Sequence, residues 1–402
     1  MITRRGTMAA GLAAIASVRA ARAADVPGAG GTTLKVGNTM PYSGPASAYA
    51  ALGYTEAAFF KSVNDQGGVA GRRIDFISLD DGYSPPRTVQ AVRQLVEQDQ
   101  VAFLFQTLGT PTNSAIVEYV NKRQIPHLFL ASGASKWSDY KRWPWTMGWQ
   151  PSYRAEARIY ARYVLAEVKD PRIAILYQSD SFGRDYLDGA RDVLGPDWSK
   201  RVAGTEGYEF SDAAIDSQVA ALQDSGANTL IVAATPRYAV QAIRKVRDLN
   251  WKPAFFLTNV STSPALVMVP AGAENGTGIV TAGYFKDPTD PAWANDVGMN
   301  EWRGFMAQSM PGASLNDTGP VVGYGASRTL LQVLRQCEGD FSRPSVMRQA
   351  ESLRQVENPV LLPGITISTS HTDHRPIKTM QLMRWTGEAW DRFGGLIEDA
   401  ET

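Results

Sequence analysis

The sequence has few of the residues from which disulfide-stabilised, nucleic-acid-binding or catalytic proteins are usually built. Cys337 is its only cysteine, so an internal disulfide is excluded, and the helical pattern around it favours a packed side chain over a nucleophile. Lys plus Arg and Asp plus Glu both number 40, which gives a formal net charge of zero. A protein that follows a phosphate backbone normally has a basic excess, so we expect neither a nucleic acid nor a strongly anionic membrane as a partner.

Recognisable catalytic motifs are also absent. The sequence has no G-x-S-x-G elbow, no P-loop and no glycine-rich dinucleotide motif after a strand. His371 and His374 form an H-x-x-H pair, but the Thr, Ser, Asp and Pro residues around them favour a turn. His127, at the start of an apolar strand, is expected to be structural. We therefore expect no metal site, no cofactor and no enzyme activity.

Residues 1–23 have the three parts of a secretory signal peptide. Arg4 and Arg5 precede a short apolar run, and an Ala-Arg-Ala site follows at residues 21–23. The apolar run is far shorter than the ~20 residues that span a bilayer. A buried or disordered N-terminal helix is the alternative, and the paired arginines leave the twin-arginine export route open. We expect cleavage after Ala23 and a mature protein in the periplasm.

The rest of the chain alternates short apolar strands with amphipathic helices. A length of 402 residues indicates two domains. The β-α-β-α order predicts an α/β fold with parallel sheets covered by helices on both faces. The alternation pauses at residues 136–152, which contain four tryptophans and form a candidate hinge, and then resumes. The elements after residue 278 are too few for a third domain and are expected to complete the first two.

The predicted strands end in small hydroxylated residues, at the edge where parallel α/β sheets bind ligands. The strand VAFLFQ, for example, breaks into TLGTPTN before a helix. N–H groups and hydroxyls at helix N-termini suit an anionic group such as a carboxylate, and nearby aromatic residues offer flat apolar walls. Ordinary capped strand-to-helix turns are the alternative. The candidate ligand-binding residues are Tyr42, Tyr49, Leu108, Gly109, Thr110, Ala131, Ser132, Gly133, Phe182, Pro236 and Asn259.

Several segments resemble the periplasmic branched-chain amino acid-binding proteins, which are the type I solute-binding subunits of ABC importers. The resemblance begins with GNTMPYSGPASAYA and NDQGGVAGRRIDFISLDDGYSPPRTVQAVRQLV. It continues through IPHLFLASGAS, RIAILYQSDSFGRDYLDGARDVL and VQAIRKVRDLNW, and so covers nearly all of the mature chain. It implies two Rossmann-like lobes joined by a three-crossover hinge, with the ligand between them.

The resemblance also implies boundaries. The three crossovers are expected near residues 146–151, 275–281 and 374–379. Lobe 1 is expected at residues 33–148 and 281–375, and lobe 2 at residues 149–280 and 376–402.

Site roles follow from the same resemblance. It implies a carboxylate clamp made of Thr110 and of Ala131, Ser132 and Gly133, with aromatic contacts from Tyr49 and Phe182.

One position departs from the family pattern. Amino acid-binding members place an acidic residue where this chain has Asn259, and no acid follows in the sequence until Glu274. A buried ammonium group without a carboxylate partner is costly, so we expect a ligand other than an α-amino acid. The segments FKDPTDPAW, LRQCEGDFSRPSVMRQA and LLPGITISTS resemble a subgroup associated with aromatic and related carboxylic acids.

The expected function is that of a solute-binding protein which captures a small, aromatic carboxylate and delivers it to an ABC permease and ATPase. We expect a monomer. Alternatives within the same fold are a protein that binds a branched-chain amino acid, an amide, urea or a short aliphatic acid, and a periplasmic ligand sensor. Neighbouring permease and ATPase genes would favour import over sensing. An enzyme is the alternative from another class, and recovery of unchanged ligand after incubation would exclude it.

Overall fold

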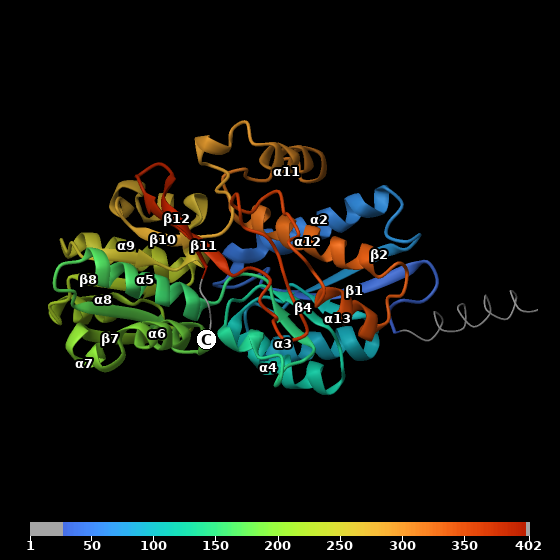
Figure 1. Cartoon of the computed structure of the whole chain (residues 1–402), viewed down its shortest axis with the longest axis horizontal. Helices are drawn as coiled ribbons and strands as arrows, with labels where there is room; N and C mark the ends of the chain where they lie inside the picture. The colour runs from blue at the N-terminus through green and yellow to red at the C-terminus, as the bar shows by residue number, and fades with distance from the viewer. Residues whose placement is uncertain (1–26, 399–402) are drawn as a thin grey trace, which may run out of the picture.

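The structure, a computed structural model, describes residues 27–398. The expected signal peptide at residues 1–23 lies outside the described residues. Two lobes lie side by side, and each contains a β-sheet with helices packed on it (Figure 1). The predicted α/β fold with two parallel-sheet lobes is therefore confirmed.

The first lobe is built on a five-stranded sheet in the order β2-β1-β3-β4-β5, and all neighbouring strands are parallel. The central strands β3 and β4 are buried along their whole length. Burial on both faces explains why they read as continuous apolar runs rather than as alternating patterns. The strands are β1 (Thr33–Met40), β2 (Arg73–Asp80), β3 (Phe103–Phe105), β4 (His127–Leu130) and β5 (Thr146–Gly148).

The second lobe is built on a seven-stranded sheet in the order β12-β11-β10-β9-β8-β6-β7. Strands β6 to β10 are parallel, whereas β11 and β12 add an antiparallel hairpin at one edge. The sequence pattern does not predict β7, an edge strand with the sequence VAGTEGY and little apolar character. The strands are β6 (Ile173–Gln178), β7 (Val202–Tyr208), β8 (Thr229–Ala233), β9 (Ala254–Leu257), β10 (Val280–Gly283), β11 (Thr379–Trp385) and β12 (Trp390–Glu398).

Helices cover both sheets, and their ends follow local sequence signals. Helix α6, for example, begins after Asp180, whose carboxylate accepts a hydrogen bond from the N–H of Phe182 at 2.9 Å. The helices of the first lobe are α2 (Ala50–Asp65), α3 (Pro85–Arg93), α4 (Thr110–Lys122), α11 (Val297–Ser309), α12 (Gly319–Gln336) and α13 (Arg343–Ala350). Those of the second are α5 (Tyr153–Glu167), α6 (Ser181–Leu194), α7 (Trp198–Arg201), α8 (Asp216–Asp224), α9 (Pro236–Asp248) and α10 (Val269–Ala271).

The chain passes between the sheets three times. It first leaves β5 after Gly148 and enters α5. The second crossover follows Gly283 and does not lie at residues 275–281, because Val280 to Gly283 are paired with β11 inside the seven-stranded sheet. The expected lobe boundary at residue 281 accordingly falls within β10. The third crossover precedes β11.

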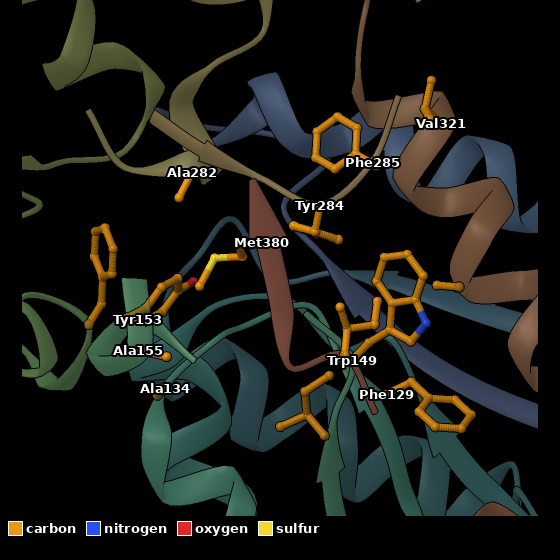
Figure 2. Close-up of a cluster of buried hydrophobic side chains, with 14 of the residues drawn as sticks. Phe129, Ala134, Trp149, Tyr153, Ala155, Ala282, Tyr284, Phe285, Val321 and Met380 are labelled. Carbon is orange, nitrogen blue, oxygen red and sulfur yellow. The ribbon is translucent and has the colours of Figure 1, made fainter. Parts of the chain in front are cut away.

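Side chains from the crossovers meet in a buried hub. The rings of Trp149 and Tyr284 pack edge to face with their centroids 5.9 Å apart, and Met380 of β11 lies with them in the same cluster (Figure 2). The indole N–H of Trp149 donates to Thr329 Oγ1 of α12 at 3.0 Å. The first two crossovers therefore contact each other through Trp149 and Tyr284, inside the apolar cluster that also contains Met380.

Candidate ligand-binding site

A pocket of about 790 Å³, part of which is open to solvent, lies between the two lobes. Contacts between the lobes surround it. Tyr49 donates its hydroxyl to the carbonyl of Val260 at 3.3 Å, and the rings of Tyr83 and Phe210 lie with centroids 4.5 Å apart. The structure therefore has its lobes closed over the pocket.

Most of the residues expected from the sequence line this pocket, although they come from loops far apart in the chain. They are Tyr49, Leu108, Gly109, Thr110, Ala131, Phe182, Pro236 and Asn259.

The pocket wall in the first lobe is formed by the N-terminus of α4. Gly109 precedes this helix with a φ of 102°, in the left-handed region, and a Cβ there would lie 2.5 Å from the Tyr83 ring. The backbone N–H groups of Thr110 and Thr112 donate to no acceptor within residues 27–398, as expected for a first helical turn. Since a helix N-terminus also carries partial positive charge, this wall can bind an anionic group.

Ser132 does not line the pocket but orients a residue that does. Its Oγ accepts a hydrogen bond from the indole N–H of Trp137 at 2.8 Å and lies 2.7 Å from Thr110 Oγ1. Either hydroxyl can donate in this contact, because Ser132 Oγ has one proton and two lone pairs. In the arrangement where Ser132 donates to Thr110, the proton of the Thr110 hydroxyl can be donated to a ligand in the pocket.

Two other expected residues also lie outside the pocket lining. Tyr42 follows β1 but turns back over the sheet, where its hydroxyl is 2.6 Å from Ser78 Oγ, and burial raises its pKa to about 12. Gly133 packs against the first crossover, where a Cβ would lie 2.5 Å from the carbonyl oxygen of Pro151. Both follow strand ends as predicted, but their local packing directs them away from the interlobe pocket.

Aromatic side chains from both lobes form the apolar part of the pocket. The rings of Tyr153 and Phe182 pack edge to face with centroids 4.7 Å apart. Tyr83, Tyr284 and Phe285 also line it. Sequence reasoning missed these three and Tyr153. Tyr284 and Phe285 follow the displaced second crossover, and Tyr83 lies two residues after Asp81, beyond the end of β2.

An acid lies beside Asn259 in the fold, although none follows it in the sequence until Glu274. The backbone N–H and side-chain Nδ2 of Asn259 donate to the two oxygens of Glu156, at 2.7 and 2.5 Å. The hydroxyl of Tyr186 donates to the same carboxylate at 2.6 Å. Glu156 is fully buried, and burial raises its pKa to about 7 against the opposing effect of these donors. Asn259 therefore covers a buried carboxyl group of α5 that lies behind the pocket wall.

A second acid, Asp317, lines the pocket itself and was not foreseen. It precedes α12, and its Oδ1 accepts hydrogen bonds from the N–H of Gly319 at 3.0 Å and from Ser263 Oγ of the other lobe at 3.3 Å. Burial raises the pKa of this carboxyl. An Asn-Asp-Thr-Gly-Pro stretch before a helix could have signalled an N-terminal capping residue, but nothing in it indicates a pocket.

The pocket also has polar atoms without partners. Gln150 Nε2 and Thr235 Oγ1 are buried and form no hydrogen bond with residues 27–398. Both residues line the pocket. Buried polar groups in proteins are normally paired, so these atoms mark places where a polar ligand can bind.

The groups considered as alternatives in the sequence lie elsewhere. Cys337 is buried outside the pocket, and burial raises its pKa to about 12, which disfavours a thiolate. His127 is fully buried beside Thr107, and burial lowers its pKa to about 3. Within residues 27–398, His, Cys, Asp and Glu side chains form no group of three or more that could hold a metal ion. Over the same residues, no helix has the length and apolar character needed to cross a membrane.

Comparison with known proteins agrees with this architecture. Residues 33–389 match the family model described as periplasmic binding protein. A curated relative, Leu/Ile/Val-binding protein homolog 1 of Brucella suis, is 22% identical over 243 residues. That match covers 60% of this chain and 65% of the relative, slightly less than two thirds of its length.

Solved structures are similar over almost the whole chain. A possible leucine/isoleucine/valine-binding protein from Rhodopirellula baltica has a TM-score of 0.79 at 20% identity, covering 92% of this chain and 97% of that one. A branched chain amino acid ABC transporter structure from Thermus thermophilus with bound valine has a TM-score of 0.81 at 14% identity, covering 92% and 97%. These solved structures support the type I fold, and the family model shows the relationship: the chain belongs to the periplasmic binding protein family.

Proposed function

We propose that this protein is the extracytoplasmic solute-binding component of an ABC importer and captures a small aromatic carboxylate between its lobes. The observation that carries the proposal is the N-terminus of α4 in the pocket wall, where Thr110 lines the pocket with a backbone N–H that has no acceptor and a hydroxyl that is able to donate. These donors at a helix N-terminus suit a carboxylate.

The rest of the pocket suits an apolar, flat body. Aromatic rings from both lobes and from the second crossover line it, including Tyr49, Phe182 and Tyr284. A ligand that contacts both lobes binds the closed form better than the open form and shifts the population toward closure. The ABC permease can then distinguish loaded from empty protein by lobe separation, without any chemical change in the ligand.

A branched-chain amino acid is the second candidate ligand. The relatives are named for leucine, isoleucine and valine, and Asp317 supplies a pocket carboxylate that could pair with an ammonium group. This weakens the argument from Asn259, because an acid is available from another loop. The aromatic lining still favours an aromatic acid as the first candidate.

The location and partners are part of the same proposal. The signal-peptide pattern of residues 1–23 supports export to the periplasm, where the protein would act as a monomer and dock on a membrane permease and its ATPase. A periplasmic sensor would share the fold and the pocket, and neighbouring permease and ATPase genes would favour import.

A thermal-shift screen tests the ligand class. Ligand that binds only the folded form stabilises it by about 2.7 kcal/mol at a hundredfold excess over Kd. We expect benzoate, phenylacetate or hydroxycinnamate to raise Tm, and leucine and isoleucine to raise it less. Stabilisation by branched-chain amino acids alone would favour the second candidate. Native mass spectrometry of the freshly purified protein gives an independent identification through any co-purified ligand.

A further inference from the structure

Asp317 is the one carboxylate in the pocket lining, and no cation faces it. Among the lining residues, all within residues 27–398, there is no Lys, Arg or His. The groups that act on Asp317 are the N–H of Gly319 and the hydroxyl of Ser263, which are neutral. An acid buried without a charged partner is costly, and this one is only 7% exposed.

The two oxygens of Asp317 have different roles. Both of its hydrogen bonds end on Oδ1, which holds the start of α12 and the contact with Ser263. Oδ2 accepts no hydrogen bond from any residue between 27 and 398. Oδ1 therefore stabilises the fold, and Oδ2 remains available to accept a hydrogen bond from a ligand.

The pocket lining thus has two polar parts of opposite character. The N-terminus of α4, with Thr110, offers donors and partial positive charge. Asp317, which precedes α12, offers an acceptor oxygen. A ligand whose only polar group is a carboxylate can pair with the α4 part and leaves Asp317 without a donor.

We infer that Asp317 is a specificity-determining residue, which selects carboxylates that also carry a hydrogen-bond donor, either a hydroxyl or an ammonium group. This inference rests on the proposed function, since it assumes that a carboxylate occupies the α4 end. The donor of the ligand binds Asp317 Oδ2, the oxygen that forms no hydrogen bond with residues 27–398. A ligand without a donor leaves the buried carboxylate unpaired and is disfavoured.

Two matched pairs of probes test the inference on the full mature protein. Phenylacetate and para-hydroxyphenylacetate differ by a hydroxyl, and isocaproate and leucine differ by an ammonium group. We expect the donor-bearing member of at least one pair to bind about tenfold or more tightly than its partner, measured by calorimetry. The pair that shows this preference identifies which donor Asp317 accepts.

The variant Asp317→Asn tests the role of Oδ2 separately from that of Oδ1. An asparagine keeps an acceptor for Gly319 and replaces the pocket-facing oxygen by an amide NH₂, which cannot accept. We expect the donor-bearing ligand to lose about tenfold or more in affinity, while the plain acid keeps its affinity or gains, since a negative charge has been removed near it. Asp290→Asn is the matched control: Asp290 caps a short helix at Pro291–Trp293 by accepting from the N–H of Ala292 at 2.8 Å, outside the pocket.

The possible outcomes distinguish a failure of the inference about Asp317 from a failure of the proposed carboxylate-binding function. If the plain acids bind as tightly as both donor-bearing partners, or if Asp317→Asn leaves the preference unchanged, Asp317 is not a selectivity residue. If none of the four probes binds, the proposed carboxylate ligand is wrong, and the inference falls with it. The wild-type preference is measured without any variant, so the test stands even if Asp317→Asn does not fold.

Discussion

Ser135 and Asp185 form a hydrogen-bonded contact between the two lobes. The backbone N–H and the hydroxyl of Ser135, which follows β4, donate to the two oxygens of Asp185 on α6, at 2.6 and 2.7 Å. Beside them, Lys136 Nζ donates to Ser181 Oγ of the second lobe at 3.0 Å. Neither Ser135 nor Asp185 lines the ligand pocket. The closed form is therefore stabilised in part by protein contacts that need no ligand.

The first prediction concerns this contact. Ser135→Ala removes a hydrogen bond to a carboxylate that exists only when the lobes are closed, worth about 1.5–3 kcal/mol. The ligand-free variant should therefore populate the open form more and show a larger radius of gyration by solution X-ray scattering, and ligand should reverse the change. Ser62→Ala is the control, since the Ser62 hydroxyl donates to Phe59 O within α2. Curves that superimpose with and without a tight ligand in both the wild type and Ser135→Ala would contradict hinge closure.

The second prediction concerns the carboxylate end of the pocket. Thr110→Val keeps the side-chain shape and removes the free hydroxyl donor, so affinity for a bound carboxylate should fall by roughly 1.5–3 kcal/mol, or about tenfold or more. Calorimetry measures the loss. The buried Thr55, whose hydroxyl donates to Ala51 O at 2.7 Å, provides the control variant Thr55→Val. Unchanged affinity in Thr110→Val would show that Thr110 does not bind the carboxylate.

The third prediction tests whether Ser132 acts through Thr110. Ser132→Ala removes the hydroxyl that lies 2.7 Å from Thr110 Oγ1, and should weaken ligand binding less than Thr110→Val does. In the double variant, the two effects on affinity should not add, because the role of Ser132 depends on Thr110. Additive losses in this cycle would mean that the two residues act independently.

The fourth prediction returns to the position at which this chain departs from its family. Asn259→Asp would place a second carboxylate against Glu156, at a distance of 2.5 Å in the present structure. Two carboxylates cannot both be ionised at such a distance, so we expect a loss of about 1–3 kcal/mol in the free energy of unfolding at neutral pH, partly recovered at lower pH. Urea unfolding measures it, with the exposed Asn300→Asp as the control. An undiminished stability would show that Asn259 can turn away from Glu156.

The fifth prediction concerns pH. In the folded protein the pKa of Glu156 is raised from 4.5 to about 7 by burial. Between these values the folded state binds more protons than the unfolded state, so stability falls as pH rises through this window and levels off above it. The full contribution is on the order of 3 kcal/mol, at about 1.4 kcal/mol per pKa unit. Glu156→Gln should flatten this slope in denaturant titrations, and Glu97→Gln, at the surface, should not.

Much of this architecture follows from local sequence. The run VAFLF is apolar without alternation because β3 is covered on both faces, and TLGTPTN after it contains the glycine and the hydroxyls that begin α4. These signals act over a few residues, so the alternation of strands and helices and the start of α4 could be predicted from them. The hinge between the lobes and the roles of single site residues were implied by the family resemblance. Strand β7 could not, because an edge strand buries little surface and needs few apolar residues.

The character of the pocket was decided by tertiary structure. Nothing in the sequence near Asn259 indicates that Glu156, 103 positions earlier, lies behind it. Nor does the sequence indicate that Asp317, from a loop of the other lobe, lines the same pocket. The pairing of β10 with β11 places the second crossover after Gly283, and local packing places Tyr42 and Gly133 outside the pocket lining. Periodicity and capping are local and can be seen in a short window of sequence. The charge that faces a ligand depends on which distant loops the lobes bring together, and only the folded chain determines that.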